Sequence, residues 1–250
     1  MPLSLSAILS LLVPLLSPVA TPDAPKELIL KKGDRIVAMG DSITAGGAKP
    51  GGYLRIVDQV LAEQYPDLAV PPIVGAGISG NKAENMAARF EKDVITKKPN
   101  VVTINVGIND VWHRLKEPHK DEVLAKHTEN VTKMVDLAQA AGAKVILIAP
   151  PLIQEDLTTE GNKRLLLYVA AQREIAKAKN CTFIDLHQMF RTAVEKRPEQ
   201  IGKGSKGNNY TSDGVHMAAP GNAIMAIAVL KGLGVPDEKI KVAEKAVEKK

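Results

Sequence analysis

A serine that could act as a nucleophile lies in the stretch 36–47, IVAMGDSITAGG. The apolar run stops at Gly40, and Asp41 and Ser42 follow at once. A serine on the turn after a buried strand presents its hydroxyl at the rim of a sheet, where it can attack a carbonyl carbon if a base takes its proton. Asp-Ser is also an ordinary pair at a helix N-terminus, because both residue types cap helices. The stretch therefore indicates a candidate nucleophile that still needs its partners.

One of the histidines has an acid close to it along the chain. His216 lies in TSDGVHMAAPGN, three residues after Asp213, on a loop that precedes the last predicted helix. A short loop of this kind can turn the carboxylate onto Nδ1 of the imidazole and leave Nε2 for the proton of Ser42. Of the remaining histidines, His127 lies on an apolar helix stripe and is interpreted as a core or boundary residue, and His119 lies in a polar run and is interpreted as solvated. His113 and His187 lie near strand ends and are interpreted as a pocket-lining residue and a rim residue.

A serine nucleophile also needs hydrogen-bond donors for the oxyanion that forms when it attacks a carbonyl. The segment GISGN offers the backbone N–H of Gly80, and VGIND offers the side-chain amide of Asn109. With the backbone N–H of Ser42, three donors would converge on one point. Taken one at a time, these residues also fit ordinary loop glycines and a turn Asn-Asp pair.

Strand and helix patterns alternate along the chain. The predicted strands are 35–39, 69–77, 100–107, 144–151 and 181–186, and the predicted helices are 51–66, 84–95, 121–142, 162–180 and 221–234. This alternation predicts right-handed crossovers and a mostly parallel five-stranded sheet, covered by helices on both faces. Two prolines make 69–77 an edge strand. In such a sheet reactive groups collect at the carboxyl ends of the strands, which is where the candidate residues lie.

Four short blocks, GDSIT, SGN, GIND and DGVH, occur in this order. In their order and spacing they resemble the GDSL-type (SGNH) hydrolase family, and the resemblance covers about residues 33–234. It implies a flavodoxin-like three-layer α/β/α sandwich. It also implies hydrolysis of esters, thioesters or acetylated sugars without a metal or another cofactor. The chain has Ile43 where the family name has leucine, and both side chains are apolar.

The resemblance also implies roles for individual residues. Ser42, Asp213 and His216 would form the catalytic triad, and Ser42, Gly80 and Asn109 would form the oxyanion hole. No G-x-S-x-G motif surrounds Ser42, which argues against the α/β-hydrolase fold. The sequence has no His, Cys and Asp cluster at metal-ligand spacing, so no metal site is predicted.

Composition limits the partners that we expect. The 250 residues are 45% hydrophobic and carry a net charge of +5, with acids and bases interleaved. Aromatic residues make up only 3%, which leaves little to stack on bases, so nucleic-acid binding is not predicted. The single cysteine, Cys181, excludes an intrachain disulfide framework and is interpreted as a small buried hydrophobic residue. Oligomeric state has no signal in the sequence.

The chain divides into three predicted parts. Residues 1–24 are apolar, with no charged side chain before Asp23, and we interpret them as a signal peptide or an N-terminal arm. Residues 25–236 form the hydrolase domain, and 237–250 form a charged C-terminal tail. The apolar stretch is short and broken by prolines, so no stable membrane anchor is predicted. We therefore expect a secreted or periplasmic protein.

These features together predict a serine ester hydrolase that works through an acyl-enzyme on small-molecule esters, acetylated carbohydrate esters among them. Aromatic content is low and only Trp112 is expected near the candidate site, so no obvious platform for stacking on a sugar is predicted. No long apolar lid is evident, which disfavours a triglyceride lipase. The alternatives are a lysophospholipase or thioesterase, an acyltransferase on the same scaffold, and a catalytically silent carbohydrate-binding module. Turnover of a short aryl ester distinguishes an enzyme from a binding module.

Overall fold

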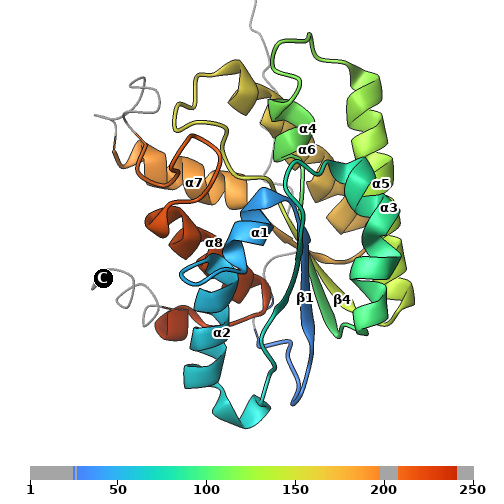
Figure 1. The fold of residues 1–250 in the computed structure, drawn as a ribbon, viewed down its shortest axis with the longest axis vertical. Helices are drawn as coiled ribbons and strands as arrows, with labels where there is room; N and C mark the ends of the chain where they lie inside the picture. The colour runs from blue at the N-terminus through green and yellow to red at the C-terminus, as the bar shows by residue number, and fades with distance from the viewer. Residues whose placement is uncertain (1–24, 26, 198–207, 241–250) are drawn as a thin grey trace, which may run out of the picture.

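The computed structural model describes residues 25, 27–197 and 208–240, and a parallel sheet of five strands lies at its centre (Figure 1). The strands are β1 (Ile36–Gly40), β2 (Val74–Gly77), β3 (Val101–Asn105), β4 (Lys144–Ile148) and β5 (Thr182–Ile184). Their order is β2-β1-β3-β4-β5, and every neighbouring pair is parallel. This is the flavodoxin-like order, so the fold class predicted from the sequence is confirmed.

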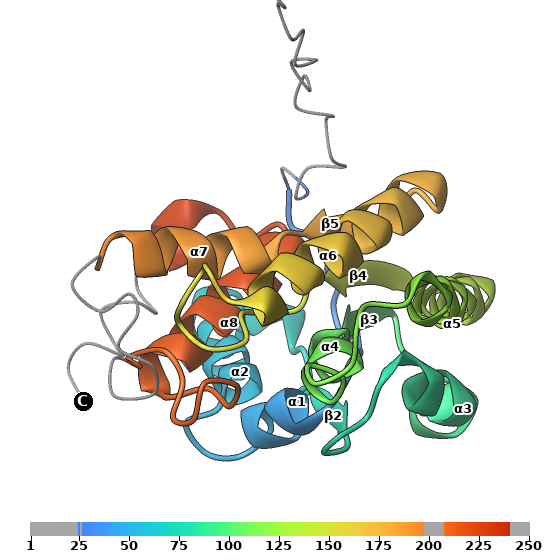
Figure 2. The ribbon, with the colours of Figure 1, turned by 90° about the horizontal axis from the view of Figure 1, so that it is seen from above.

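Helices cover both faces of the sheet. They are α1 (Ser42–Gly47), α2 (Tyr53–Gln64), α3 (Ala83–Asp93), α4 (Ile108–Trp112), α5 (Asp121–Ala140), α6 (Glu160–Ala178), α7 (Leu186–Glu195) and α8 (Ala219–Gly232), with short 3₁₀ turns η1 (Pro66–Leu68) and η2 (Ile95–Lys97). Figures 1 and 2 show α2, α7 and α8 on one side of the sheet, with α3 and α5 on the other. The result is three layers.

The central strands β1 and β3 are buried along their whole length, which explains why their sequences are nearly continuous apolar runs, whereas the edge strand β2 is only partly buried. Successive side chains of a strand point to opposite faces, and β1 follows this rule. Ile36 and Ala38 join the core cluster under α2 and α8, whereas Val37 and Met39 join the cluster under α3 and α5. The sheet therefore separates two hydrophobic cores and cannot slip in register without exposing one of them.

The strand order reverses its direction at β1. From β1 the chain passes to β2 on one side, and β3 pairs with β1 on the other. In open α/β sheets, ligands bind outside the carboxyl ends of the strands at such a switch point. Ser42 follows β1 directly, and Asn109 follows β3. The topology therefore brings the candidate nucleophile and a candidate oxyanion donor to the same place.

Some predicted elements differ from the observed ones. The edge position of β2 is confirmed, but the strand begins at Val74 rather than at residue 69, because Pro71 and Pro72 have no N–H for a ladder. Helix α7 was not predicted, although Asp185 caps it through the N–H of Gln188. The short helices α1 and α4 were treated as turns. Both helices begin at the candidate site, α1 at Ser42 and α4 at Ile108, next to Asn109.

The described residues cover only part of the predicted N-terminal and C-terminal regions. The predicted signal peptide, 1–24, lies outside the described residues. The first four residues of the predicted charged tail, 237–240, are helical, and Ile240 is buried in the core. The packed part of the chain therefore extends beyond the boundary predicted at residue 236. Among the described residues, no helix is both long enough and apolar enough to cross a bilayer.

Candidate active site

The turn after β1 presents Ser42. Asp41 is the N-cap of α1, and its Oδ1 accepts the N–H of Ile43 at 2.9 Å, so Ser42 is the first residue of the helix. Gly40 allows the chain to turn so sharply, because a Cβ at this position would lie 2.0 Å from Oγ1 of Thr44. The capping interpretation of Asp-Ser is therefore correct for Asp41. It does not compete with the role predicted for Ser42, whose hydroxyl remains free to face another loop.

Ser42, His216 and Asp213 form a continuous chain of short contacts. Oγ of Ser42 lies 2.9 Å from Nε2 of His216, and Nδ1 of His216 lies 2.6 Å from Oδ2 of Asp213. The acid and base predicted from the sequence therefore meet the predicted nucleophile. A carboxylate at Nδ1 places the imidazole proton there and leaves Nε2 as the acceptor for the serine proton.

Asp213 is oriented by its own loop. Its Oδ1 accepts the backbone N–H of Val215 at 3.0 Å and of His216 at 2.8 Å. Burial by itself would raise the pKa of Asp213, but these hydrogen bonds and the one from the His216 ring hold it below its ordinary value. The carboxyl therefore stays ionised beside the imidazole. The side chains of Asp213 and His216 are 51% and 41% exposed, so the site is open to solvent.

The loop after β2 approaches the same point. Ile78 donates its N–H to the carbonyl of Gly40 at 3.2 Å, and Gly80 adopts a φ of +77°, which glycine tolerates best. Gly77 must be a glycine, because a Cβ there would lie 2.2 Å from the backbone N of Ala45. The structure therefore brings the Gly80 segment against the start of α1, as the sequence predicts.

Asn109 lies on the other side of Ser42, at the start of α4, and is only 1% exposed. Its Nδ2 lies 3.1 Å from the carbonyl oxygen of Asn81 and 3.3 Å from Oδ2 of Asp41. Both amide hydrogens thus have acceptors. These acceptors hold the amide next to Asp41, the residue that precedes Ser42 in the chain.

Asp41 is fully buried, and its environment is unusual for a carboxyl group. Burial raises the pKa of Asp41 from its ordinary value of 3.8 to about 7. The N–H of Ile43 opposes this rise, and the neighbouring carboxyl of Asp110 adds to it. The buried carboxyl of Asp41 accepts two hydrogen bonds, one from the backbone of α1 and one from the amide of Asn109.

Arg89 of α3 ties the strand ends together. Its guanidinium donates to the carbonyls of Gly40 and Ala76, both at 2.9 Å, and to Oδ1 of Asn81 at 2.7 Å. It also pairs with Asp93 at 2.9 Å. One side chain thus connects β1, β2 and the loop that carries Gly80.

Comparison with known proteins identifies the family of this chain. Residues 38–224, three quarters of the chain, match the GDSL-like lipase/acylhydrolase family. The chain belongs to this family. The resemblance noted in its sequence motifs is therefore confirmed.

Relatives of this GDSL-family chain are esterases. It is 29% identical over 216 residues to an acetylxylan esterase of Geobacillus stearothermophilus, a match that covers 81% of this chain and 94% of the relative. It is 30% identical to esterase TesA of Pseudomonas aeruginosa over 115 residues, about half of each protein. The chain is a carboxylic ester hydrolase, a serine esterase of the SGNH type.

Solved structures of similar proteins have the same fold. An acetylxylan esterase from Geobacillus stearothermophilus superposes with a TM-score of 0.68 at 27% identity, covering 82% of this chain and 96% of the other. The acetyl xylan esterase AlAXEase gives a TM-score of 0.70 at 30% identity, covering 78% and 97%. These matches extend over nearly the whole length of both relatives.

A buried polar network lies next to Asn109 in this GDSL-family chain. His127, predicted to be a core or boundary residue, is 1% exposed. Its Nδ1 lies 3.2 Å from Oδ1 of Asp110, and its Nε2 lies 3.1 Å from Nε2 of Gln172, which also donates to the carbonyl of Val106 at 2.9 Å. Because the Gln172 amide nitrogen is a donor, His127 accepts at Nε2 and carries its proton on Nδ1. The network joins both ends of the β3–α4 turn to α5 and α6.

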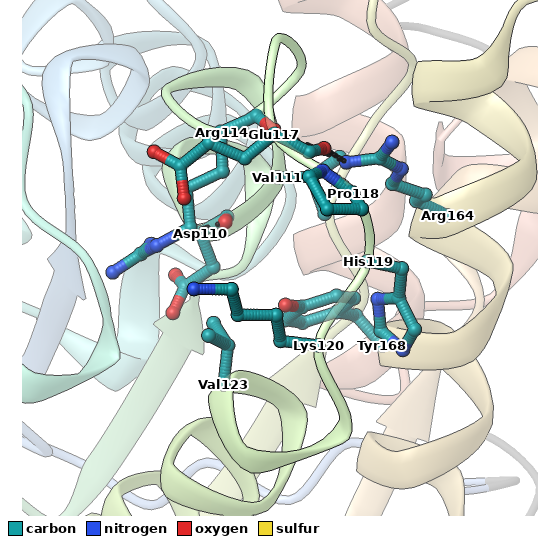
Figure 3. Close-up of a pocket in the computed structure, with 10 residues that line it drawn as sticks. All are labelled: Asp110, Val111, Arg114, Glu117, Pro118, His119, Lys120, Val123, Arg164 and Tyr168. Atoms are coloured by element: carbon teal, nitrogen blue, oxygen red, sulfur yellow. Dashed lines mark hydrogen bonds between the residues drawn. The ribbon is translucent and has the colours of Figure 1, made fainter.

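A small cavity opens beside α4 and the segment that follows it (Figure 3). Its lining includes Asp110, Val111, Arg114, Lys120, Arg164 and Tyr168. It includes neither Ser42 nor His216. We therefore do not assign ester binding to this cavity. Among the residues that the structure describes, no group of three or more His, Cys, Asp or Glu could hold a metal ion.

Two exposed apolar side chains lie on the segments that carry Asn109 and Gly80. Trp112, at the end of α4, is 37% exposed, and its ring lies edge-on to His216 with centroids 6.4 Å apart. Ile78, in the loop after β2, is 46% exposed. The predicted nearness of Trp112 to the candidate site is therefore correct.

Proposed function

We propose that this esterase uses Ser42 as nucleophile, His216 as general base and acid, and Asp213 to orient the imidazole. The proposal is carried by the unbroken contact chain of 2.9 Å and 2.6 Å that links the three side chains. Those distances are within the range required for proton transfer between a nucleophile and its base.

The reaction follows from this arrangement. Nε2 of His216 accepts the hydroxyl proton while Oγ of Ser42 attacks the ester carbonyl carbon. The tetrahedral intermediate collapses, the C–O bond to the alcohol breaks, and His216 gives its proton to the departing alcohol oxygen. Water then attacks the acyl-enzyme with the same base, which releases the acid and restores the serine.

We assign the oxyanion hole to the backbone N–H groups of Ser42 and Gly80 and to the amide of Asn109. The N–H of Ser42 is at the start of α1, where backbone donors have no partner within the helix. The amide of Asn109 would give up its longer contact, the one of 3.3 Å to Asp41, when an oxyanion forms. The donors are held in place before the reaction, which is the condition for electrostatic stabilisation of the transition state.

We propose acetylated carbohydrates as the substrate class. The indole of Trp112 offers a flat apolar surface beside His216, suited to the apolar face of a sugar ring, while the open triad leaves room for a bulky alcohol portion. Relatives that match over most of the chain are named acetylxylan esterases. A small acyl group with a large sugar fits this combination better than a long acyl chain does.

The decisive experiment measures coupling within the triad. Ser42→Ala and His216→Ala should each remove most of kcat/KM on an aryl acetate, and the double variant should be little worse than either, because the base has no purpose without the nucleophile. Asn109→Ala should lower kcat by about 10²–10³, the usual effect of one oxyanion donor. Circular dichroism checks that every variant is folded.

Two results would contradict the proposal. Retained activity in folded Ser42→Ala would exclude Ser42 as the nucleophile, and losses that simply add in free energy would separate Ser42 from His216. The substrate assignment is tested by comparing acetylated xylo-oligosaccharides with lysophospholipid and aryl esters. A higher kcat/KM on lysophospholipid than on acetylated sugar would refute it.

A further inference from the structure

Glu155, in the loop between β4 and α6, contacts the 209–217 loop at its base. The side chain is only 7% exposed. Its Oε1 accepts the backbone N–H groups of Tyr210 and Thr211, each at 2.8 Å, and the Thr211 hydroxyl at 2.9 Å, while Oε2 accepts the N–H of Asn209 at 2.9 Å. Three consecutive backbone N–H groups and one hydroxyl thus converge on one carboxylate.

The residue before it fastens the same loop at a second point. The N–H of Gln154 donates to the carbonyl of Gly214 at 2.6 Å. Gln154 adopts a φ of +60°, a conformation that residues other than glycine seldom adopt. An antiparallel bridge between Thr211 and Met217 closes the loop on itself. The loop is therefore held at its base by Glu155 and near its tip by Gln154.

The chemistry at the base of the loop requires a carboxylate. Hydrogen bonds to an ionised acceptor are shorter and stronger than those between neutral groups. Buried backbone N–H groups without an acceptor carry a large desolvation cost, and a loop has no ladder to satisfy them. A glutamine at position 155 could accept at only one of its two terminal atoms. Its amide nitrogen would face the N–H of Asn209, which is also a donor.

We infer that Glu155 is a positioning residue for ester hydrolysis: its carboxylate holds the 209–217 loop so that Asp213 and His216 meet Ser42. This inference rests on the function proposed above for those three residues. Glu155 acts through the loop and does not touch the reacting atoms. Reaction rates are sensitive to such support, because a misplacement of about 1 Å can lower a rate by about 10²-fold.

The test compares Glu155→Gln with Glu174→Gln, which removes an exposed carboxylate from the neighbouring helix α6. Glu155→Gln should lower kcat at least about 10-fold and leave KM for an aryl acetate nearly unchanged, because the loop positions the base rather than the substrate. Proton NMR should show weakening or loss of the downfield Nδ1–H signal of His216. Glu174→Gln should match the wild type in all three measurements. Assays are run well below the midpoint of thermal unfolding of each variant.

Thr211→Val is the second variant, since it removes a single hydroxyl donor and keeps the shape of the side chain. It should lower kcat less than Glu155→Gln does, and it decides the question if Glu155→Gln does not fold. If Glu155→Gln folds and keeps the wild-type kcat and an unchanged His216 signal, the inference is overturned. If Glu155→Gln does not fold, the same result in Thr211→Val overturns it. Ser42→Ala distinguishes this failure from failure of the proposed function. If Ser42→Ala is inactive while these variants are normal, only the role of Glu155 is wrong.

Discussion

At the scale of single residues, Asp41 has the most constrained environment in the site. Its carboxyl caps α1 through the N–H of Ile43 and accepts the amide of Asn109, yet it is completely buried. A buried carboxylate loses its hydration, which disfavours the ionised form. The same position that orients Asn109 therefore makes the folded protein sensitive to pH.

The pKa of Asp41 gives this sensitivity a definite sign. The pKa of Asp41 is raised from 3.8 to about 7 in the folded protein. Between those pH values the folded protein therefore binds the proton of the Asp41 carboxyl more tightly than the unfolded chain does. The contribution of Asp41 to the free energy of unfolding is therefore largest below pH 3.8 and falls as the pH rises to about 7. Asp41→Asn cannot ionise and should lack this decline.

Urea unfolding across that pH window measures the effect. The free energy of unfolding of Asp41→Asn, taken relative to that of the wild type, should rise with pH. The variant should still be less stable overall, because its new amide nitrogen faces the amide of Asn109. Asp67→Asn, at an exposed site, should give a curve parallel to the wild type. Parallel curves for Asp41→Asn and the wild type would show that the carboxyl is not protonated preferentially in the folded state.

At the scale of elements, the site depends on how closely the strand ends are held. Gly77 lets the end of β2 approach α1, and Arg89 of α3 bonds to the last residue of β1 and to the loop after β2. A guanidinium has several donors in a planar fork, so it can serve carbonyls on different strands at once. The helix on one face thereby orders the edge at which Ser42 is presented.

Arg89→Lys tests this connection, since it keeps the charge and removes the fork. A lysine cannot reach three acceptors, so the free energy of unfolding should fall by about 1–3 kcal/mol, the cost of leaving buried acceptors unpaired. The kcat should fall as well, because the loop that carries Gly80 loses the hydrogen bond that Arg89 donates to Asn81. Lys92→Gln, an exposed change on the same helix, serves as the control for urea unfolding and kinetics. Unchanged stability and kcat in Arg89→Lys would mean that the strand ends are held without it.

At the scale of the whole molecule, the packed part of the chain runs at least to Ile240. The first 24 residues of the sequence differ in composition from the rest. They are apolar and lack charged side chains before Asp23, and small residues at Ala20 and Ala24 are suitable for cleavage. An esterase acting on polymeric acetylated sugars would meet its substrate outside the cell. Composition and proposed function thus both favour export.

Export predicts a shortened chain. Mass spectrometry of protein made by cells with export machinery should find a new N-terminus between Thr21 and Lys26. Leu12→Arg, which places a charge in the apolar run, should block processing and leave the full chain inside the cell. Wild-type protein with intact Met1 in a soluble cytoplasmic fraction would contradict export.

The architecture and the five proposed site residues could be predicted because their signals are local. The run 100–107 is apolar almost throughout because both faces of its strand are buried, and the stripe of 121–142 follows the 3.6-residue period of a helix with one buried face. Parallel strands then bring Ser42, Gly80 and Asn109 to one edge. Helix α7 was missed although Leu186, Phe190 and Val194 recur at helical spacing and are buried.

The partners of these residues were decided only by the tertiary structure. Glu155 lies 54 to 56 residues from the N–H groups that it accepts, and Asp41 lies 68 residues from Asn109. Nothing near Glu155 in the sequence distinguishes a buried acceptor from a solvated acid. A hydrogen bond depends on two groups meeting at a set distance and angle, and for groups far apart in the chain that meeting is fixed by how the sheet and helices pack.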